Sequence, residues 1–531
     1  MEKMDTFYFP RAATPEEVGV SSLEVKEFLH DCDRRGLNMH SMMVLRHGKV
    51  ATECTWAPFD ELIPHTMFSF SKQITAIAIG FCWSEGLLKL EDKVSKFFPS
   101  EDVKDEKIRK QNDEITVYHL ITMHSGKKIS VADNKEKNEW LHNWFNAPFS
   151  DAPGESFFYL SENIYILSRI VSAVTGMSMT DYLTPRLYEP LGMKVPYWEK
   201  DHNGYDAGGW GLFLTLESMA KIAQCFLQMG EFNGKQVIPA DWIKLATSTH
   251  VEKIPPVFKE DLGYGFQLFI QPERYAGVYS FNGLYTQFAF IFPKEEAVFV
   301  CTAGDPHEKI FIELFWDHFP KAFIDNTDPD PEGFAALKAY QKKMADRVPP
   351  MGLRIPETEK RINGRLIKTT RRANAGVLGI GNLQNLSHRS GQIDSFCFKF
   401  DTDSLRVEFQ EKNSPKAVLD VGLDGEYKFS TIHLADLDVP VASFGTWVND
   451  STFKLTVIPL NMAQYREFIF RFLPGNVVRV TSHAKPGLKD LFEFYLMFQG
   501  TRPGKLLNAA LPVAGKGIGL VLDPNFFGVM K

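Results

Sequence analysis

The chain has 531 residues, of which 44% are hydrophobic and 24% charged, and its formal net charge is -7. This length exceeds what one hydrophobic core usually serves, so it favours two domains. The charges are spread along the sequence instead of forming basic runs, which excludes nucleic acid and anionic lipid as expected partners.

The amino-terminal residues 1–20 lack the apolar stretch and small-residue cleavage site of a secretory signal, and no apolar run approaches membrane-spanning length. We therefore expect a cytoplasmic protein without a membrane partner. Six cysteines without C-x-x-C spacing indicate buried free thiols instead of a zinc site or a disulfide framework. No pair of histidines has H-x-x-x-H spacing, and we expect neither a metal nor a cofactor.

The first element that carries chemistry is a strongly apolar helix predicted from Ser69 to Glu85 and ended by a left-handed glycine. It opens with SFSK, an S-x-x-K motif that puts Lys72 one turn from Ser69 on the same face. A serine needs a base to accept its proton, and a lysine can serve when burial lowers its pKa. The motif therefore indicates a nucleophile and its base, with the Ser69 amide available to an oxyanion.

The S-x-x-K pattern alone is weak, because it also occurs at Ser125 and Ser482. Ser125 falls in a glycine-containing turn, and Ser482 precedes a Lys-Pro-Gly loop; of these three serines, only Ser69 begins a long apolar helix. From the spacing alone, a helix-capping serine explains Ser69 as well as a nucleophile does.

A second helix is predicted over Glu162–Thr175, from apolar side chains at helical spacing and a glycine after its end. Tyr159 lies in the loop before this helix. A core tyrosine is the alternative interpretation of Tyr159, and an N-cap is the alternative interpretation of Ser161.

The last third of the sequence has a different pattern. An acidic, proline-broken stretch over Asp325–Gly333 suits a linker, and a helix is predicted over Glu332–Arg347. Beyond it, alternating apolar and polar residues predict antiparallel strands, notably over residues 395–400, 405–409 and 452–457. The predicted organisation is a first domain over 1–325, a linker and helix over 326–350, and a β-rich barrel or sandwich over 351–531.

Several segments together resemble a known family. Residues 64–99, PHTMFSFSKQITAIAIGFCWSEGLLKLEDKVSKFFP, are similar to the nucleophile segment of class C β-lactamases, DD-peptidases and their esterase and amidase relatives. ITVYHLITMHSG at residues 115–126 and PLGM at 190–193 match further family segments in the same order. The likeness runs from about Met42 to Ala303. It implies an α+β fold in which helices flank an antiparallel sheet, with a helical subdomain near residues 87–205.

The resemblance also assigns roles to residues. PGESFFYLS resembles the second family motif, P-G-x-x-F-x-Y-x-[NS], which makes Tyr159 the motif tyrosine and puts Ser161 where many β-lactamases have Asn. This serine is closer to the nylon-oligomer hydrolase and esterase branch. The resemblance thus implies Ser69 as the acylated nucleophile, with Lys72 and Tyr159 sharing its proton.

The third family motif, K-T-G or H-x-G on a strand, aligns on Gly283. Phe281 and Asn282 then replace the polar pair, and the Leu284 amide becomes the second oxyanion donor. A plain hairpin glycine is the alternative. Trp210 is expected to line the cleft, with a core indole as the alternative. The expected substrate-binding residues are Ser161, Trp210, Phe281, Asn282 and Gly283.

The sequence therefore predicts a serine hydrolase that cleaves a small-molecule ester or amide through an acyl-enzyme. DD-peptidase, β-lactamase or D-aminopeptidase activity is one alternative. A binding or sensing protein that has lost catalysis on the same scaffold is another, and the sequence leaves a homo-oligomer open.

Overall fold

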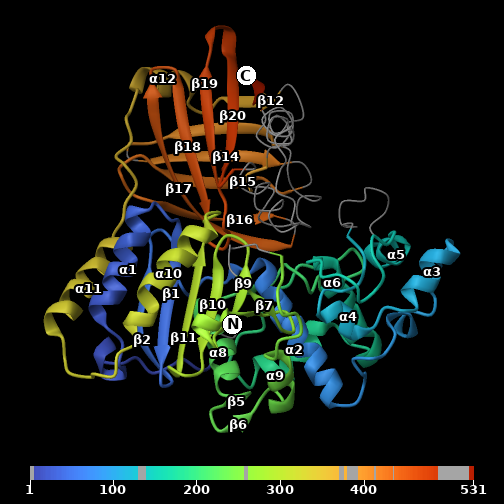
Figure 1. Cartoon of the computed structure of the whole chain (residues 1–531). Helices are drawn as coiled ribbons and strands as arrows, with labels where there is room; N and C mark the ends of the chain where they lie inside the picture. The colour runs from blue at the N-terminus through green and yellow to red at the C-terminus, as the bar shows by residue number, and fades with distance from the viewer. Residues whose placement is uncertain are drawn as a thin grey trace, which may run out of the picture.

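The computed structural model describes residues 5–128, 139–255, 261–369, 376–378, 393–402, 404–411, 414–434, 436–487 and 525–531. Figure 1 shows a first domain, residues 5–345, with a C-terminal β domain, residues 356–531, seated on one end of it. None of the helices in the described ranges combines the length and apolar character that crossing a bilayer requires.

The first domain is built on an antiparallel sheet with the strand order β2-β1-β11-β10-β9-β8-β7. The central strands β1, β10 and β11 are buried along their whole length, which matches their nearly continuous apolar sequences. The strands are β1 (Met39–Arg46), β2 (Lys49–Thr55), β7 (Gly263–Tyr264), β8 (Phe269–Ile270), β9 (Tyr279–Gly283), β10 (Gln287–Phe292) and β11 (Ala297–Ala303). Short hairpins are made by β3 (His65–Thr66) with β4 (Phe213–Leu214) and by β5 (Glu231–Phe232) with β6 (Lys235–Gln236).

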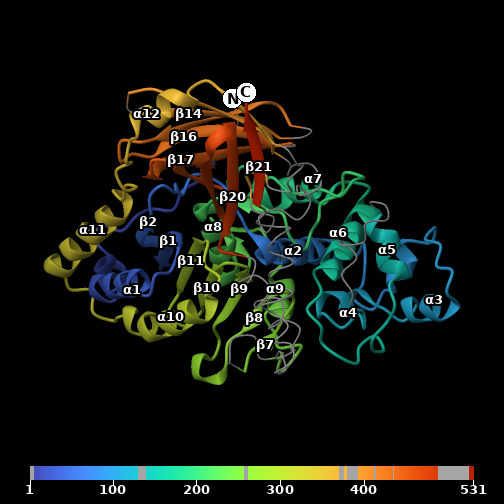
Figure 2. The ribbon, with the colours of Figure 1, turned by 90° about the horizontal axis from the view of Figure 1, so that it is seen from above.

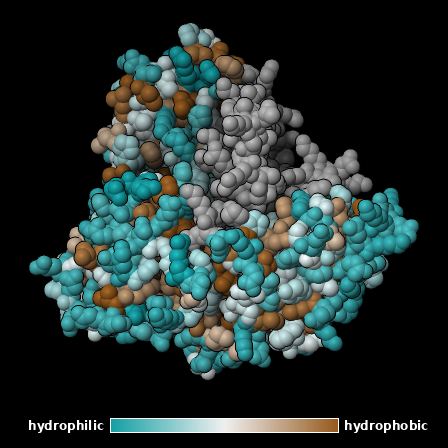
Figure 3. Space-filling model, in the orientation of Figure 1, coloured by the Kyte–Doolittle hydropathy of each residue, from teal (hydrophilic) through white to brown (hydrophobic). Residues whose placement is uncertain are grey.

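Helices cover both faces of this sheet, as expected. One face packs on α1 (Ser22–Arg34), α10 (Glu308–Ala322) and α11 (Pro331–Ala345). The other packs on α2 (Ser71–Ser84), α8 (Leu216–Leu227) and α9 (Ala240–Ala246). Over the side that carries α1 and α11, the surface in Figure 3 is mostly hydrophilic, which fits helices that bury one face only.

The predicted helical subdomain is also present, on the α2 side of the sheet (Figure 1). It contains α3 (Glu106–Asn112), α4 (Val117–Ile121), α5 (Trp140–Asn146), α6 (Ser161–Thr175) and α7 (Met179–Leu183). Helix α6 agrees with the predicted second helix to within one residue and ends at Gly176, whose φ is 71°.

Helix α11 forms within the segment expected to be linker and helix, but it does not behave as a linker. Leu337 and Met344 are fully buried in the core of the first domain, and Gln341 Nε2 donates to Thr52 Oγ1 at 2.6 Å on β2. The connection between the domains therefore begins at about residue 346, and not at 326. Acidic and proline residues gave the segment a linker composition, while Leu337 and Met344, seven residues apart on one helix face, attach it to the sheet.

The C-terminal domain is a curled, mostly antiparallel sheet that begins with α12 (Pro356–Ile362). Its described strands have the order β15-β14-β13-β12-β21-β20-β19-β18-β17-β16, and a pairing between Gly422 and Phe444 joins β15 to β17. The predicted barrel-like β domain is therefore confirmed, and its interior is filled by aromatic and aliphatic side chains. The strands are β12 (Leu366–Thr369), β13 (Ile393–Phe400), β14 (Ser404–Glu411), β15 (Ala417–Gly422), β16 (Lys428–Leu434), β17 (Leu437–Asn449), β18 (Thr452–Pro459), β19 (Tyr465–Phe472), β20 (Val477–Lys485) and β21 (Asn525–Met530).

One loop of the C-terminal domain, residues 460–464 between β18 and β19, docks on the first domain. The backbone N–H of Thr66 donates to the carbonyl of Asn461 at 2.9 Å. Gly304 lies so close that a Cβ built on it would sit 2.1 Å from the carbonyl oxygen of Ala463, which leaves room only for glycine. In the view from above in Figure 2, the C-terminal domain lies to one side of the first domain and leaves the strands β7, β8 and β9 uncovered. The docked loop thus holds the strand that leads into Ser69.

Candidate active site

Ser69 lies in a 3₁₀ turn, Phe68–Phe70, directly before α2. The predicted helix began at Ser69, whereas the α-helix begins at Ser71, because the chain turns sharply at Phe68, whose φ is 47°. A non-glycine residue in the left-handed region is strained, and such strain is often found beside functional groups. Ser69 stays partly exposed although α2 behind it is almost entirely buried.

Lys72 reaches the Ser69 hydroxyl. Its Nζ lies 2.9 Å from Ser69 Oγ and 2.7 Å from the carbonyl oxygen of Gly209. The side chain is buried, and burial lowers the pKa of Lys72 to about 7, against the opposing effect of the Glu162 carboxylate. A large fraction of Lys72 is therefore neutral at neutral pH, as a general base must be.

Tyr159 completes the group. Its hydroxyl is hydrogen-bonded to the Ser69 side chain, and the centre of its ring lies 5.0 Å from Lys72 Nζ. Burial raises the pKa of Tyr159 above its usual value, so the phenol stays protonated at neutral pH. Of the two groups, Lys72 can thus accept a proton at neutral pH, whereas Tyr159 can donate one.

The S-x-x-K segments at Ser125 and Ser482 have no such arrangement. Ser125 is buried in a turn, and Lys128 forms an ion pair with Asp151 at 2.6 Å. Ser482 is buried in β20, and Lys485 pairs with Glu467 at 2.8 Å. In both segments the lysine is thus bound by a carboxylate instead of by the serine.

The backbone of β9 passes next to the Ser69 turn. A Cβ on Gly283 would lie 2.3 Å from the carbonyl oxygen of Met67, so the close approach requires glycine. Leu284, the next residue, is partly exposed. The two backbone segments expected to hold an oxyanion therefore lie side by side.

Two residues that were expected to bind substrate, Phe281 and Trp210, are instead buried in the core. Phe281 is fully buried, and its ring packs edge to face against Phe70 and Phe226, so it faces the core. Trp210 is 5% exposed and packs on Trp140, with ring centres 5.4 Å apart. Asn282 is also buried, and its Oδ1 has no hydrogen-bond partner among the described residues.

Ser161 is the first residue of α6 and not its N-cap. Leu160 holds the cap position, and no side chain caps the helix. Ser161 is partly exposed, and its carbonyl oxygen would lie 2.4 Å from a Cβ on Gly209. This contact fixes the backbone of Gly209, whose carbonyl binds Lys72.

Sequence reasoning missed three contributors to the site. The Gly209 carbonyl orients Lys72 across 137 residues of sequence. Glu308, at the start of α10, is buried and accepts hydrogen bonds from the backbone of Tyr285 and Thr286. Gln287 is buried below the same turn. Only the Gly208-Gly209 pair left a signal in the sequence, as a place of close backbone approach.

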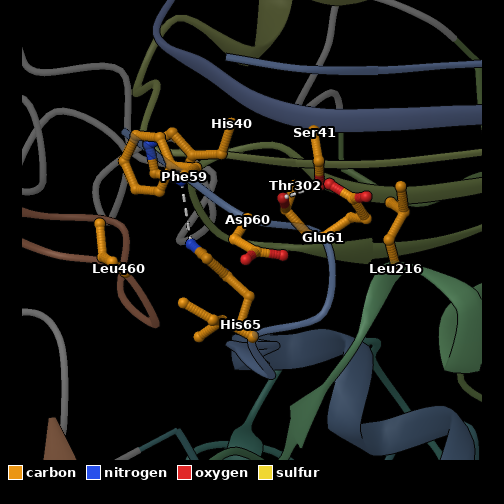
Figure 4. Close-up of a pocket in the computed structure, with 10 residues that line it drawn as sticks. His40, Ser41, Phe59, Asp60, Glu61, His65, Leu216, Thr302 and Leu460 are labelled. Carbon is orange, nitrogen blue, oxygen red and sulfur yellow. Dashed lines mark hydrogen bonds between the residues drawn. The ribbon is translucent and has the colours of Figure 1, made fainter. Parts of the chain in front are cut away.

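A small cavity lies behind the strand that leads to Ser69 (Figure 4). Its volume of about 10 Å³ has room for one water at most. His40 and His65 meet in its wall, with Nδ1 of His40 3.0 Å from Nε2 of His65, and burial lowers the pKa of both. This pair braces β3 and is too enclosed for a substrate.

The six cysteines are all buried and free, as expected. Within the described ranges, no three His, Cys, Asp or Glu side chains gather in a way that could hold a metal ion.

Comparison with known proteins agrees with this geometry. A family model for beta-lactamase matches residues 24–313, more than half of the chain. The chain belongs to the beta-lactamase family. The match contains Ser69, Lys72 and Tyr159, and the beta-lactamase fold accounts for the sheet and its helices.

Individual beta-lactamase-family relatives are distant. Protein flp from Staphylococcus aureus (strain MW2) is 28% identical over 200 residues, which are 34% of this chain and 40% of that protein. The chain therefore spans less than half the length of this relative. A putative 6-aminohexanoate-dimer hydrolase from Bacillus anthracis is 20% identical, with a TM-score of 0.47 over 64% of this chain and 88% of that one. An octameric penicillin-binding protein homologue from Pyrococcus abyssi is 18% identical, with a TM-score of 0.45 over 86% and 97%.

Proposed function

We propose that this protein is a serine hydrolase that cleaves ester or amide bonds through an acyl-enzyme on Ser69. The observation that carries the proposal is the 2.9 Å separation of Lys72 Nζ and Ser69 Oγ, with Lys72 buried. A serine next to a neutral amine can lose its proton as it attacks a carbonyl carbon. The S-x-x-K segments at Ser125 and Ser482 do not offer this pair, and in two further segments, at Ser218 and Ser451, Lys221 is paired with Asp5 and Lys454 with Glu467.

The proposed reaction uses the same groups twice. Neutral Lys72 accepts the Ser69 proton, and Tyr159 passes it to the leaving oxygen or nitrogen. The amides of Ser69 and Leu284 stabilise the oxyanion, as preorganised donors do in acyl transfer. A water that gives its proton to the Lys72 and Tyr159 pair then releases the acyl group.

The proposed substrates are neutral at the position where many relatives bind a carboxylate. Asn282 stands in place of a polar or cationic third-motif residue, and the Phe281 ring is buried in the core. The Phe281 ring cannot donate a hydrogen bond, and Asn282 has no positive charge to pair with a carboxylate. This supports esters or amides of neutral acids as substrates over penicillins, cephalosporins or D-alanyl peptides.

Substitution of the serines tests the proposal. Ser69→Ala is expected to abolish hydrolysis of a p-nitrophenyl ester while the melting temperature holds, because loss of one partly exposed oxygen leaves no large cavity. Ser125→Ala and Ser482→Ala, the matched controls from two other S-x-x-K segments, should keep nearly full activity. Equal losses in all three variants would refute Ser69 as the nucleophile.

A further inference from the structure

The turn that carries Leu284 is held by two buried side chains that have no part in the chemistry proposed above. The turn, residues 284–286, connects β9 to β10, and both Tyr285 and Thr286 adopt left-handed backbone angles, with φ of 62° and 69°. Non-glycine residues rarely adopt these angles unless neighbouring groups impose them. Two such residues in succession call for a structural cause.

Gln287 holds the turn by donating hydrogen bonds to the backbone carbonyl oxygens of the turn. Its Nε2 donates to Leu284 O at 3.1 Å, to Tyr285 O at 2.8 Å and to Ala303 O at 2.7 Å on β11. Gln287 is fully buried, so water does not compete for these contacts. The peptide planes that follow Leu284 and Tyr285 are therefore tied to the centre of the sheet.

Glu308 holds the turn by accepting hydrogen bonds from the backbone amides of the turn. Its carboxyl group accepts hydrogen bonds from the backbone N–H of Tyr285 and of Thr286. Glu308 is 4% exposed, and its Oε1 has no hydrogen-bond partner among the described residues. One buried carboxyl group therefore sets the direction of both amides.

The held turn is in contact with the nucleophile segment. The ring of Tyr285 packs edge to face on the ring of Phe68, the residue before Ser69, with centroids 5.4 Å apart. On the other side of Leu284, Gly283 lies against Met67 O. Both neighbours of Leu284 are thus fixed relative to Ser69, which fixes where the Leu284 N–H points.

We propose that Glu308 is a positioning residue that, together with Gln287, holds the Leu284 amide in line with the Ser69 amide so that both can bind an oxyanion. The inference rests on the proposed acyl transfer at Ser69. Oxyanion donors act only when they are preorganised, and removing one costs on the order of 10²- to 10³-fold in kcat. A donor that is displaced but still present is expected to lower kcat by less than its removal would.

The charge of Glu308 adds a second consequence. The titratable groups that face it are Asp305 from the loop before α10 and Tyr159 from the segment before α6. Burial raises the pKa of Glu308 to about 8, so the carboxyl is largely neutral at pH 7 and ionises above pH 8. Both forms accept the two N–H bonds, and the ionised form adds negative charge to the turn that carries Leu284. The wild-type kcat should therefore fall above pH 8.

Three substitutions at Glu308 test the inference. Glu308→Gln keeps an oxygen for both amides but cannot ionise, so it should retain kcat within about 3-fold at pH 7 and lose the alkaline fall. Glu308→Ala removes the acceptor, and Glu308→Asp shortens its reach. Both should lower kcat by roughly 10-fold or more while KM changes little, as for a group that acts in the transition state. Glu313→Gln, on the exposed side of α10, is the matched control.

Phosphonylation of Ser69 gives a readout that does not depend on turnover. A fluorophosphonate probe should label wild-type Ser69, and label Glu308→Ala and Glu308→Asp more slowly than Glu308→Gln. Normal labelling and normal kcat in Glu308→Ala and Glu308→Asp would overturn the positioning role and leave the proposed function intact. A loss in folded Glu308→Gln as large as in Glu308→Ala would also overturn it. A wild-type protein that is never labelled would refute acyl transfer itself, and the positioning role with it.

Discussion

Lys72 Nζ lies 2.9 Å from Ser69 Oγ and is shielded from water, so the two residues form a pair whose proton balance depends on pH. Burial lowers the pKa of Lys72 to about 7, which makes the lysine charged below that pH and neutral above it. Only the neutral form can accept the serine proton.

We therefore expect kcat/KM for a neutral ester to rise between pH 6 and pH 8 with an apparent pKa near 7. A pH–rate profile of the wild-type protein measures this rise. The Lys72→Arg variant should be inactive from pH 6 to pH 8, because arginine cannot lose its proton. A flat wild-type profile from pH 5.5 to pH 8 would mean that Lys72 is not the base.

The protonated Tyr159 is expected to contribute through proton relay. Tyr159→Phe should lower kcat by roughly 10²-fold or more, the usual contribution of general acid–base catalysis. Ser161→Ala should cost less, and its melting temperature should equal that of the wild type because Ser161 makes no capping bond to α6. Steady-state kinetics and thermal melts of both variants provide the check. A wild-type kcat in Tyr159→Phe would show that the phenol is structural.

Much of this site could be predicted from local sequence. The S-x-x-K spacing put Lys72 beside Ser69, and Gly283 of the third motif predicted that the end of β9 lies close to the Ser69 turn. What local patterns could not show depends on contacts distant in the chain, such as Lys72 with Gly209 or Glu308 with the turn after β9.

The fold shows the same limit. Alternation predicted the C-terminal strands, because each strand buries one face along its length. The helix predicted over Glu332–Arg347 forms as α11, but the proline and acidic residues assigned it to the linker, since composition does not reveal that Leu337 and Met344 pack against the first domain. Phe281 was expected near substrate by alignment, yet the alternation of β9 directs its ring into the core.

The contacts of α11 change the expected pattern of proteolysis. Cleavage between Asp325 and Pro350 should occur before Pro331 or after Ala345, where the chain has no regular structure, and should spare α11. The two fragments should stay associated through the docked loop, residues 460–464. Limited proteolysis followed by mass spectrometry and size-exclusion chromatography tests both points. Early cleavage inside α11 would contradict its packing on the first domain.

The third motif leads to a prediction on substrate choice. A lost hydrogen bond to a charged group costs on the order of 1.5–3 kcal/mol, or roughly 10- to 150-fold in affinity. We expect kcat/KM for p-nitrophenyl butyrate to exceed that for a chromogenic cephalosporin, whose carboxylate finds no cationic partner in Asn282 or Phe281. A clear preference for the cephalosporin would show that a cation from elsewhere in the chain reaches the site.

The central claim is that Ser69 is an activated nucleophile, and its covalent capture tests this most directly. The folded wild-type protein, treated with a fluorophosphonate at pH 8, should gain the mass of one adduct, and peptide mapping should locate the adduct on Ser69. Ser69→Ala should stay unmodified, and Ser125→Ala should react like the wild type. An unmodified wild-type protein at high probe concentration, or an adduct on another serine, would contradict the account.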